Sequence, residues 1–352
     1  MDELPAPNFP APPSWSITVG DLGKGLVYIA AFAFIVAVLC GIFGKGSDGS
    51  KRLARVGFIF GSLSLIAVFG FLASLFIANR FEYEYVWKHA DSSNALGYRI
   101  AGIWSGQEGS FLLWGVCASL FGLLVLRGVG TFARWYVVVY SLFLGSIAGI
   151  LAYESPFKLI ELDGRTIVPF NGMGLAPTLQ NYWVTIHPPT IFLGFGSLTA
   201  LFALAAAAML TKDRDGWIPI VRPWAIVATT LVGLGLCMGG FWAYETLGWG
   251  GFWMWDPVEN VSFVPWCFGI IVQTTRGTWK TTNLLLGGLP FLAFLFGTFL
   301  TRSGFLADAS VHSFAEMDRS ALRLLVGLMG VSTLGFLGLW VFRLVQARGE
   351  AR

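Results

Sequence analysis

Residues 190–210 read TIFLGFGSLTALFALAAAAML, a run of 21 residues that contains no charged side chain. An α-helix of this length rises about 30 Å, which matches the hydrocarbon core of a bilayer. Similar apolar runs recur along the chain and predict an all-α, polytopic integral membrane protein with about nine transmembrane helices. The runs expected to span are Gly25–Phe43, Val56–Ile77, Gly109–Leu126, Trp135–Ala152, Thr190–Leu210, Trp224–Tyr244, Val261–Thr275, Leu284–Leu300 and Leu324–Val341.

The overall composition supports the same class of protein. Of the 352 residues, 55% are apolar and 12% are charged, whereas a soluble domain carries about 25% charged residues. This balance excludes a single soluble core and an intrinsically disordered chain. The first apolar run is not preceded by a basic segment, so we expect a spanning helix there and not a secretory signal. The chain has no phosphate-binding GxxxxGK[ST] motif and no dense basic patch, and we therefore expect no nucleic acid partner.

The distribution of charge predicts the orientation of these helices. One set of connecting segments carries 14 basic and four acidic residues, and the opposite set carries nine basic and 16 acidic residues. Basic connections stay on the cytoplasmic side. The N-terminus is therefore expected outside and the C-terminus in the cytoplasm.

The long connections lie on the predicted outer face of one transmembrane helical domain, residues 1–352. Two of them, residues 153–189 and 301–323, carry histidines, and a third surrounds a tryptophan-rich segment at residues 241–266. Because loops held by a rigid scaffold commonly carry binding residues, function is expected at this face.

The tryptophan-rich segment reads FWAYETLGWGGFWMWDPVENVSFVPW and contains five of the 15 tryptophans. An aromatic belt at the membrane surface is the simple explanation. Glycines and polar residues among the rings instead favour a site for a large planar ligand, and Asp256-Pro257 is typical of a helix start. The candidate binding residues are Trp242, Trp249, Gly251, Trp253, Trp255, Asp256, Glu259 and Asn260.

This segment resembles the "WWD" signature of the haem-handling proteins of cytochrome c biogenesis. It is most similar to the N-terminal half of the CcmF-type haem lyase component of the bacterial system I pathway. The resemblance continues in order through GQEGS at 106–110, LLW at 112–114, IHPP at 186–189, GTFLTRSG at 297–304 and SVHSF at 310–314.

The resemblance implies that His187 and His312 are axial ligands of a non-covalent haem b, a usual role for histidine. A hydrogen bond at the membrane interface is the alternative for each. Because proline disfavours helical geometry in the residue before it, we expect His187 just outside the helix that follows. His89 matches no ligand motif and is expected to be structural.

One departure limits the expected number of haems. The family has a histidine within the helix after the WWD segment, where this chain has Gln273 and Thr274, and we expect no histidine inside any span. We therefore predict at most one haem per chain. The family is also longer than this chain. The chain is therefore a natural short form, one part of a split form or a truncated piece, and for a split form the expected partner is a second chain that supplies the C-terminal half.

Arg302, at the outer end of the eighth run, is a further candidate. Arginine pairs well with carboxylates such as haem propionates. Contact between the Arg302 side chain and lipid phosphate is an alternative that the sequence favours equally.

The resemblance implies a function in cytochrome c maturation. The protein would present haem to apocytochrome c for thioether attachment to CxxCH cysteines, as a haem lyase component in a complex of the bacterial inner membrane. A haem donor chaperone, apocytochrome c and its thiol-handling chaperones are the expected partners, and no residue of this chain is expected to be catalytic. The alternatives are a haem exporter or relay of the same superfamily and a cofactor-free transporter or structural subunit.

Overall fold

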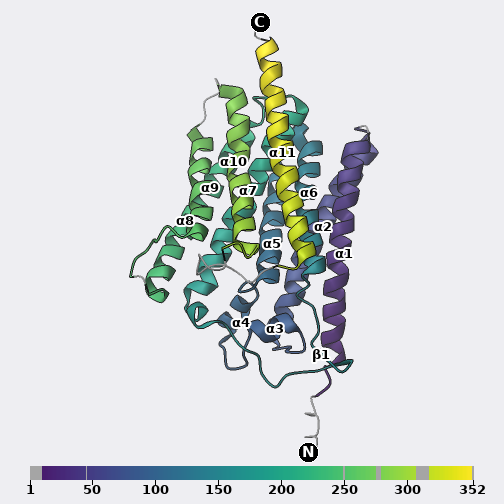
Figure 1. Ribbon diagram of the computed structural model, residues 1–352. Helices are drawn as coiled ribbons and strands as arrows, with labels where there is room; N and C mark the ends of the chain where they lie inside the picture. The colour runs from purple at the N-terminus through teal and green to yellow at the C-terminus, as the bar shows by residue number, and fades with distance from the viewer. Residues whose placement is uncertain (1–9, 45, 249, 275–278, 307–316, 351–352) are drawn as a thin grey trace, which may run out of the picture.

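The computed structural model describes residues 10–44, 46–248, 250–274, 279–306 and 317–350 and shows a bundle of long helices (Figure 1). Within these residues the only sheet is a two-stranded antiparallel hairpin. In chain order the elements are α1 (Ser14–Phe43), α2 (Asp48–Ile77), α3 (Glu84–His89), α4 (Leu96–Gly102), α5 (Gln107–Val125), η1 (Gly130–Phe132), α6 (Ala133–Tyr153), β1 (Glu161–Leu162), β2 (Arg165–Thr166), η2 (Pro177–Leu179), α7 (Trp183–Thr211), α8 (Ile218–Thr246), α9 (Pro257–Thr274), α10 (Lys280–Arg302) and α11 (Arg319–Glu350).

Among the described residues, eight helices are long and apolar enough to cross a membrane. They are α1, α2, α5, α6 together with η1, α7, α8, α10 and α11. This confirms the prediction of a polytopic all-α membrane protein. The remaining expected run lies in α9, whose apolar part, Val258–Val272, rises only about 22 Å.

Helix α7 lies at the centre of the bundle and α11 at its edge. The most apolar stretch of α7 is 89% buried, whereas that of α11 is 17% buried. Glycines allow the neighbouring helices to approach α7 closely. A Cβ on Gly196 would lie 2.6 Å from the backbone nitrogen of Ala118 in α5, and one on Gly194 would lie 2.8 Å from that of Val232 in α8.

The long connections gather at one end of the bundle, the lower end in Figure 1, where α3, α4 and the hairpin lie. The start of α1 is fixed to this end by hydrogen bonds. The Tyr83 hydroxyl donates to the Ser16 carbonyl oxygen at 2.7 Å. The Ser16 hydroxyl in turn donates to the fully buried carboxylate of Glu82, which also pairs with Arg80 at 3.0 Å. Helix α1 begins at this lower end, and α11 finishes at the upper end, so the N-terminal and the C-terminal ends of the described chain lie at opposite ends of the bundle.

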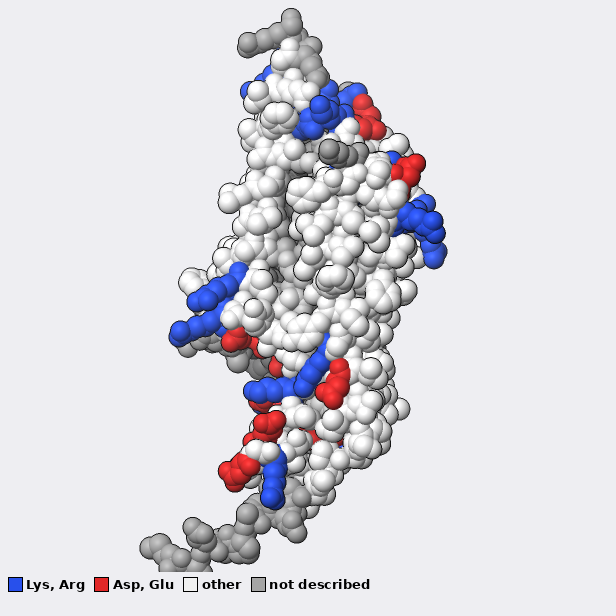
Figure 2. All heavy atoms as spheres, turned by 90° about the vertical axis from the view of Figure 1, so that its right-hand side faces the viewer, with Lys and Arg blue, Asp and Glu red and all other residues white. Residues whose placement is uncertain are grey.

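The charged side chains lie toward the ends of the bundle. On the face drawn in Figure 2, a broad uncharged surface separates an upper end dominated by Lys and Arg from a lower end where Asp and Glu are frequent. A surface of this kind is suited to lipid between the two ends.

Candidate functional site

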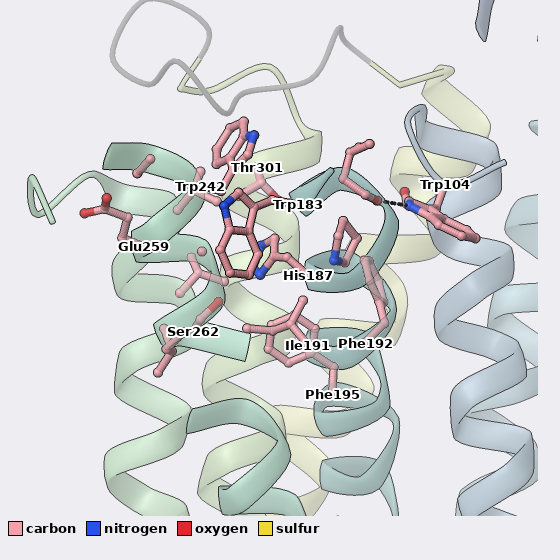
Figure 3. Close-up of a pocket in the computed structure, with 18 of the residues that line it drawn as sticks. Trp104, Trp183, His187, Ile191, Phe192, Phe195, Trp242, Glu259, Ser262 and Thr301 are labelled. Carbon is pink, nitrogen blue, oxygen red and sulfur yellow. Dashed lines mark hydrogen bonds between the residues drawn. The ribbon is translucent and has the colours of Figure 1, made fainter. Parts of the chain in front are cut away.

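A cavity of about 480 Å³ lies at the end of the bundle that carries the long connections, between α5, α7, α8, α9 and α10 (Figure 3). This volume falls within the range of small-molecule and cofactor sites. Among the described residues, nine tryptophan and phenylalanine side chains line it. They are Trp104, Trp114, Trp183, Trp242, Trp253, Phe111, Phe192, Phe195 and Phe294.

His187 lines this cavity from within α7, which corrects the expectation that it lies outside the helix and outside every span. Its Nδ1 is 2.9 Å from the carbonyl oxygen of Gly235 in α8. A Cβ on Gly239 would lie 2.9 Å from Cε1 of the ring, so glycine one turn further along α8 makes room for the imidazole.

The helix continues through Pro188 and Pro189 because tertiary contacts offset the local preference. Pro188 cannot donate to the carbonyl of Val184, four residues earlier. Nε1 of Trp104 donates to that oxygen instead, at 2.9 Å. The prediction from the proline pattern was wrong, and the donor that replaces the missing amide comes from a distant part of the chain, which a local pattern does not reveal.

The candidate residues of the tryptophan-rich segment divide into two groups. Trp242, Trp253 and Glu259 line the cavity, whereas Gly251, Trp255, Asp256 and Asn260 are not part of its wall. Trp255 is 66% exposed and adopts the left-handed backbone region, with φ of 59°. Its ring meets that of Trp253 edge-on at a centroid distance of 5.9 Å.

The acidic residues of this segment stabilise the start of α9, as their spacing predicted. The backbone nitrogen of Val258 donates to Oδ1 of Asp256 at 2.8 Å, and that of Asp256 donates to Oε2 of Glu259 at 3.1 Å. The Glu259 bond is the back-bond of a capping box, and the Asp256 side chain caps the second amide of the helix. Asn260 adds a bond from Nδ2 to the carbonyl oxygen of Trp255 at 3.1 Å.

Arg302 ends α10 at the cavity wall and is only 8% exposed. Its guanidinium lies 5.6 Å from the ring centroid of Phe111 and interacts electrostatically with Glu108. The side chain is thus buried against the cavity and does not extend along the outer surface of the bundle.

The GQEGS segment is held by Tyr85 of α3. The Tyr85 hydroxyl accepts from the backbone nitrogens of Gly106 and Gly109 at 3.2 and 3.1 Å and donates to the Ile103 carbonyl oxygen at 2.9 Å. Burial raises the pKa of Tyr85 far above its ordinary value, so the hydroxyl keeps the proton that it donates. A Cβ on Gly109 would collide with the Ile103 carbonyl oxygen, so only glycine fits at position 109.

Several residues of the cavity were not predicted as site residues. Trp104 precedes the GQEGS segment, Trp114 ends the LLW segment, and Trp183 stands four residues before His187. Their nearness to the recognised motifs was the available signal. Trp249 and His312 lie outside the described residues.

The cavity wall has the chemistry that a planar ligand with polar edges requires. It combines flat aromatic faces with one imidazole and one guanidinium. The indole nitrogens of Trp114 and Trp253 are buried and have no hydrogen-bond partner among the described residues. Buried donors of this kind commonly find an acceptor in a ligand or in water. The donor set and the aromatic faces fit haem.

Comparison with known proteins places the chain among cytochrome c biogenesis proteins. The family model described as "Cytochrome C assembly protein" matches residues 104–306. The chain is 33% identical over 351 residues to the cytochrome c-type biogenesis protein CcmF of Haemophilus influenzae, covering 94% of this chain and 52% of that protein. It is 33% identical over 313 residues to CcmF of Escherichia coli, covering 84% and 47%.

A solved structure shares the architecture. The chain is similar to the structure named "Cytochrome c Heme Lyase CcmF", with a TM-score of 0.69 and 29% identity over 98% of this chain and 58% of that one. The chain spans about half the length of the curated relatives that it matches.

Proposed function

The chain belongs to the cytochrome c assembly protein family, and on that premise we propose that it holds haem in the aromatic cavity and presents it to apocytochrome c. In this proposal it is a haem lyase component that works within a larger maturation complex. Its cofactor is haem b, bound without a covalent bond.

The observation that carries this proposal is the meeting of His187 and Arg302 in one aromatic cavity. Imidazole is a usual axial ligand of haem iron, and guanidinium pairs with carboxylates such as the haem propionates. Trp183, Trp242 and Trp253 offer flat apolar area, about 150–250 Å² for each indole. A cavity of 480 Å³ with this lining is suited to a tetrapyrrole more than to a small polar metabolite.

The hydrogen bond at Nδ1 prepares His187 for this role. When Nδ1 donates its proton to the Gly235 carbonyl, the lone pair of the ring is carried by Nε2. A bond of this kind also fixes the orientation of the ring, as it does for metal-bound histidines in general. We propose His312 as the second axial ligand.

In this mechanism the protein contributes position. Haem, when bound, would supply the two vinyl groups to which the two thiols of a CxxCH sequence add to give thioethers. The indoles would hold the ring and exclude water from it, and Arg302 would pair with its propionates. Holding reactants in line can remove much of a reaction barrier.

We also propose where the protein works and with which partners. The charge asymmetry supports an inner-membrane location with the cavity at the periplasmic face. The partners are then a haem donor chaperone, apocytochrome c and its thiol-handling chaperones.

The experiment is an absorption spectrum and pyridine haemochrome assay of the purified chain, expressed with ample haem. His187→Ala should shift the Soret band, and free imidazole should restore it. Trp253→Ala should lower haem occupancy without shifting the remaining spectrum, because an indole contributes contact area and no ligand bond. His89→Asn is the control, since His89 is not part of the cavity wall.

Folded protein without a Soret band would contradict the proposal, as would a wild-type spectrum in His187→Ala. A relay that carries haem without attaching it would bind haem normally and leave apocytochrome c unmodified in a reconstituted attachment assay.

A further inference from the structure

Val184, in the first turn of α7, has a backbone carbonyl that the helix cannot satisfy. In an α-helix this oxygen accepts from the amide four residues later, and here that residue is Pro188, which has no N–H. Buried backbone acceptors almost always find a donor elsewhere.

Trp104 supplies that donor from another part of the fold. Its Nε1 donates to the Val184 oxygen at 2.9 Å, the bond drawn as a dashed line in Figure 3. The half-buried indole also packs in a small hydrophobic cluster with Ala101, Leu175 and Val184. Trp104 stands between α4 and α5, so one side chain connects that segment to the start of α7.

We infer that Trp104 is a positioning residue for the haem site. Its indole N–H replaces the missing amide of Pro188 and holds the first two turns of α7 at the cavity wall. Those turns carry Trp183 and His187. Only the haem measurement below rests on the proposed function. The hydrogen bond joins two protein groups and is present without a ligand.

The ring of Trp104 also lines the cavity, so loss of the ring must be separated from loss of the donor. Trp104→Phe keeps an aromatic ring and removes the N–H. Trp340→Phe is the matched control. Nε1 of Trp340 donates to the Thr281 carbonyl oxygen at 2.8 Å, and the residue four positions after Thr281 is Leu285, which has an amide of its own.

The first test measures hydrogen exchange of the full chain in detergent without added haem. Backbone amides of residues 183–191 should exchange about tenfold faster in Trp104→Phe than in the wild type, since a lost hydrogen bond shifts local opening by about that factor. Trp340→Phe should leave this region unchanged. Equal exchange in Trp104→Phe and the wild type would overturn the inference.

The second test restores the donor within the helix. Pro188→Ala gives position 188 an amide that can bond the Val184 oxygen, so the indole N–H becomes dispensable. Trp104→Phe combined with Pro188→Ala should therefore exchange within about twofold of Pro188→Ala alone. If Trp104→Phe does not fold, the double variant should fold, and its failure would overturn the inference.

The haem readout follows the same pattern. Trp104→Phe should broaden or shift the Soret band, and Pro188→Ala should reverse that change. A shift that Pro188→Ala does not reverse would assign Trp104 a contact with the ligand and overturn its positioning role. Absence of haem from every variant, with the exchange pattern intact, would reject the proposed function and leave the hydrogen-bond role in place.

Discussion

Two glycines of α8 determine how the His187 side chain of α7 is placed. Its imidazole occupies space that exists because Gly239 of α8 has no side chain, and its Nδ1 meets a carbonyl of the same helix at Gly235. His89 has a different environment. It packs against the Tyr85 ring at a centroid distance of 4.4 Å and against Gly106, and its Nδ1 is 2.8 Å from the Tyr85 carbonyl oxygen.

We predict that His89 makes stability depend on pH. Burial, and secondarily the charge of Lys88, lower the pKa of His89 below its ordinary value of about 6.5, although the Tyr85 carbonyl acts in the opposite direction. The unfolded chain therefore takes up a proton at a higher pH than the folded chain. The contribution of His89 is complete above about pH 6.5 and is lost as the pH falls through the pKa of the folded state.

The measurement compares melting temperatures in detergent at pH 7.5 and pH 5.5. His89→Asn keeps an amide donor for the Tyr85 carbonyl and does not titrate, so its melting temperature should fall less between the two conditions than that of the wild type. An equal fall in both proteins would assign the pH dependence to other groups.

At the scale of the element, the start of α9 determines how the tryptophan-rich segment enters the bundle. Asp256 caps the first turn and Glu259 bonds back to the backbone nitrogens of Asp256 and Met254. Glu259 also lines the cavity, and Figure 3 shows its carboxylate directed away from His187, toward the turn that it caps. Because Glu259 binds the backbone nitrogen of Met254, the cap also fixes the backbone beside Trp253.

We predict that Asp256 acts through the cap and not through its charge. Asn caps a helix as well as Asp does, so Asp256→Asn should keep the melting temperature and the haem content close to those of the wild type. Asp256→Ala should lose about 1 kcal/mol of stability and part of the haem. Glu161→Ala, at an exposed carboxylate of β1, is the control. Haem loss in Asp256→Asn equal to that in Asp256→Ala would show that the negative charge, and not the helix cap, is what retains haem.

At the scale of the whole molecule, the bundle is organised around α7, with the long connections collected at one end. Eight long helices alone would return the chain to the side where it began. If α9 also crosses, the number of membrane crossings is odd. An odd number agrees with the start of α1 and the end of α11 at opposite ends of the bundle. The short apolar part of α9 is compatible with crossing because it packs against α8 and α10 and not only against lipid.

We predict that the C-terminus lies in the cytoplasm, because the basic connections lie at that end of the bundle. A fluorescent protein fused to the C-terminus should therefore be fluorescent. Alkaline phosphatase fused after Asp163, in the turn between β1 and β2, should be active, because this turn lies with the long acidic connections. Phosphatase activity from a C-terminal fusion would show that the orientation is inverted.

The sequence by itself determined the membrane-embedded helical class and the start of α9. Both depend on terms that act along the chain: the length of an apolar run must match a bilayer, and Asp256-Pro257 followed by Glu259 satisfies the first amides of a helix locally. The recognised motifs also named the family. Each of these properties is independent of which distant residues become neighbours.

Only the tertiary structure decided how the cavity is built. The two prolines after His187 predicted a helix that starts later, whereas α7 begins at Trp183. The indole of Trp104, 80 positions before Val184, donates to the carbonyl oxygen that Pro188 cannot serve. In the same way, Gly239 and Arg302 became part of the cavity because α8 and α10 pack beside α7. Local pattern fixes what a segment prefers, and the free energy of contacts between distant segments decides whether that preference is kept.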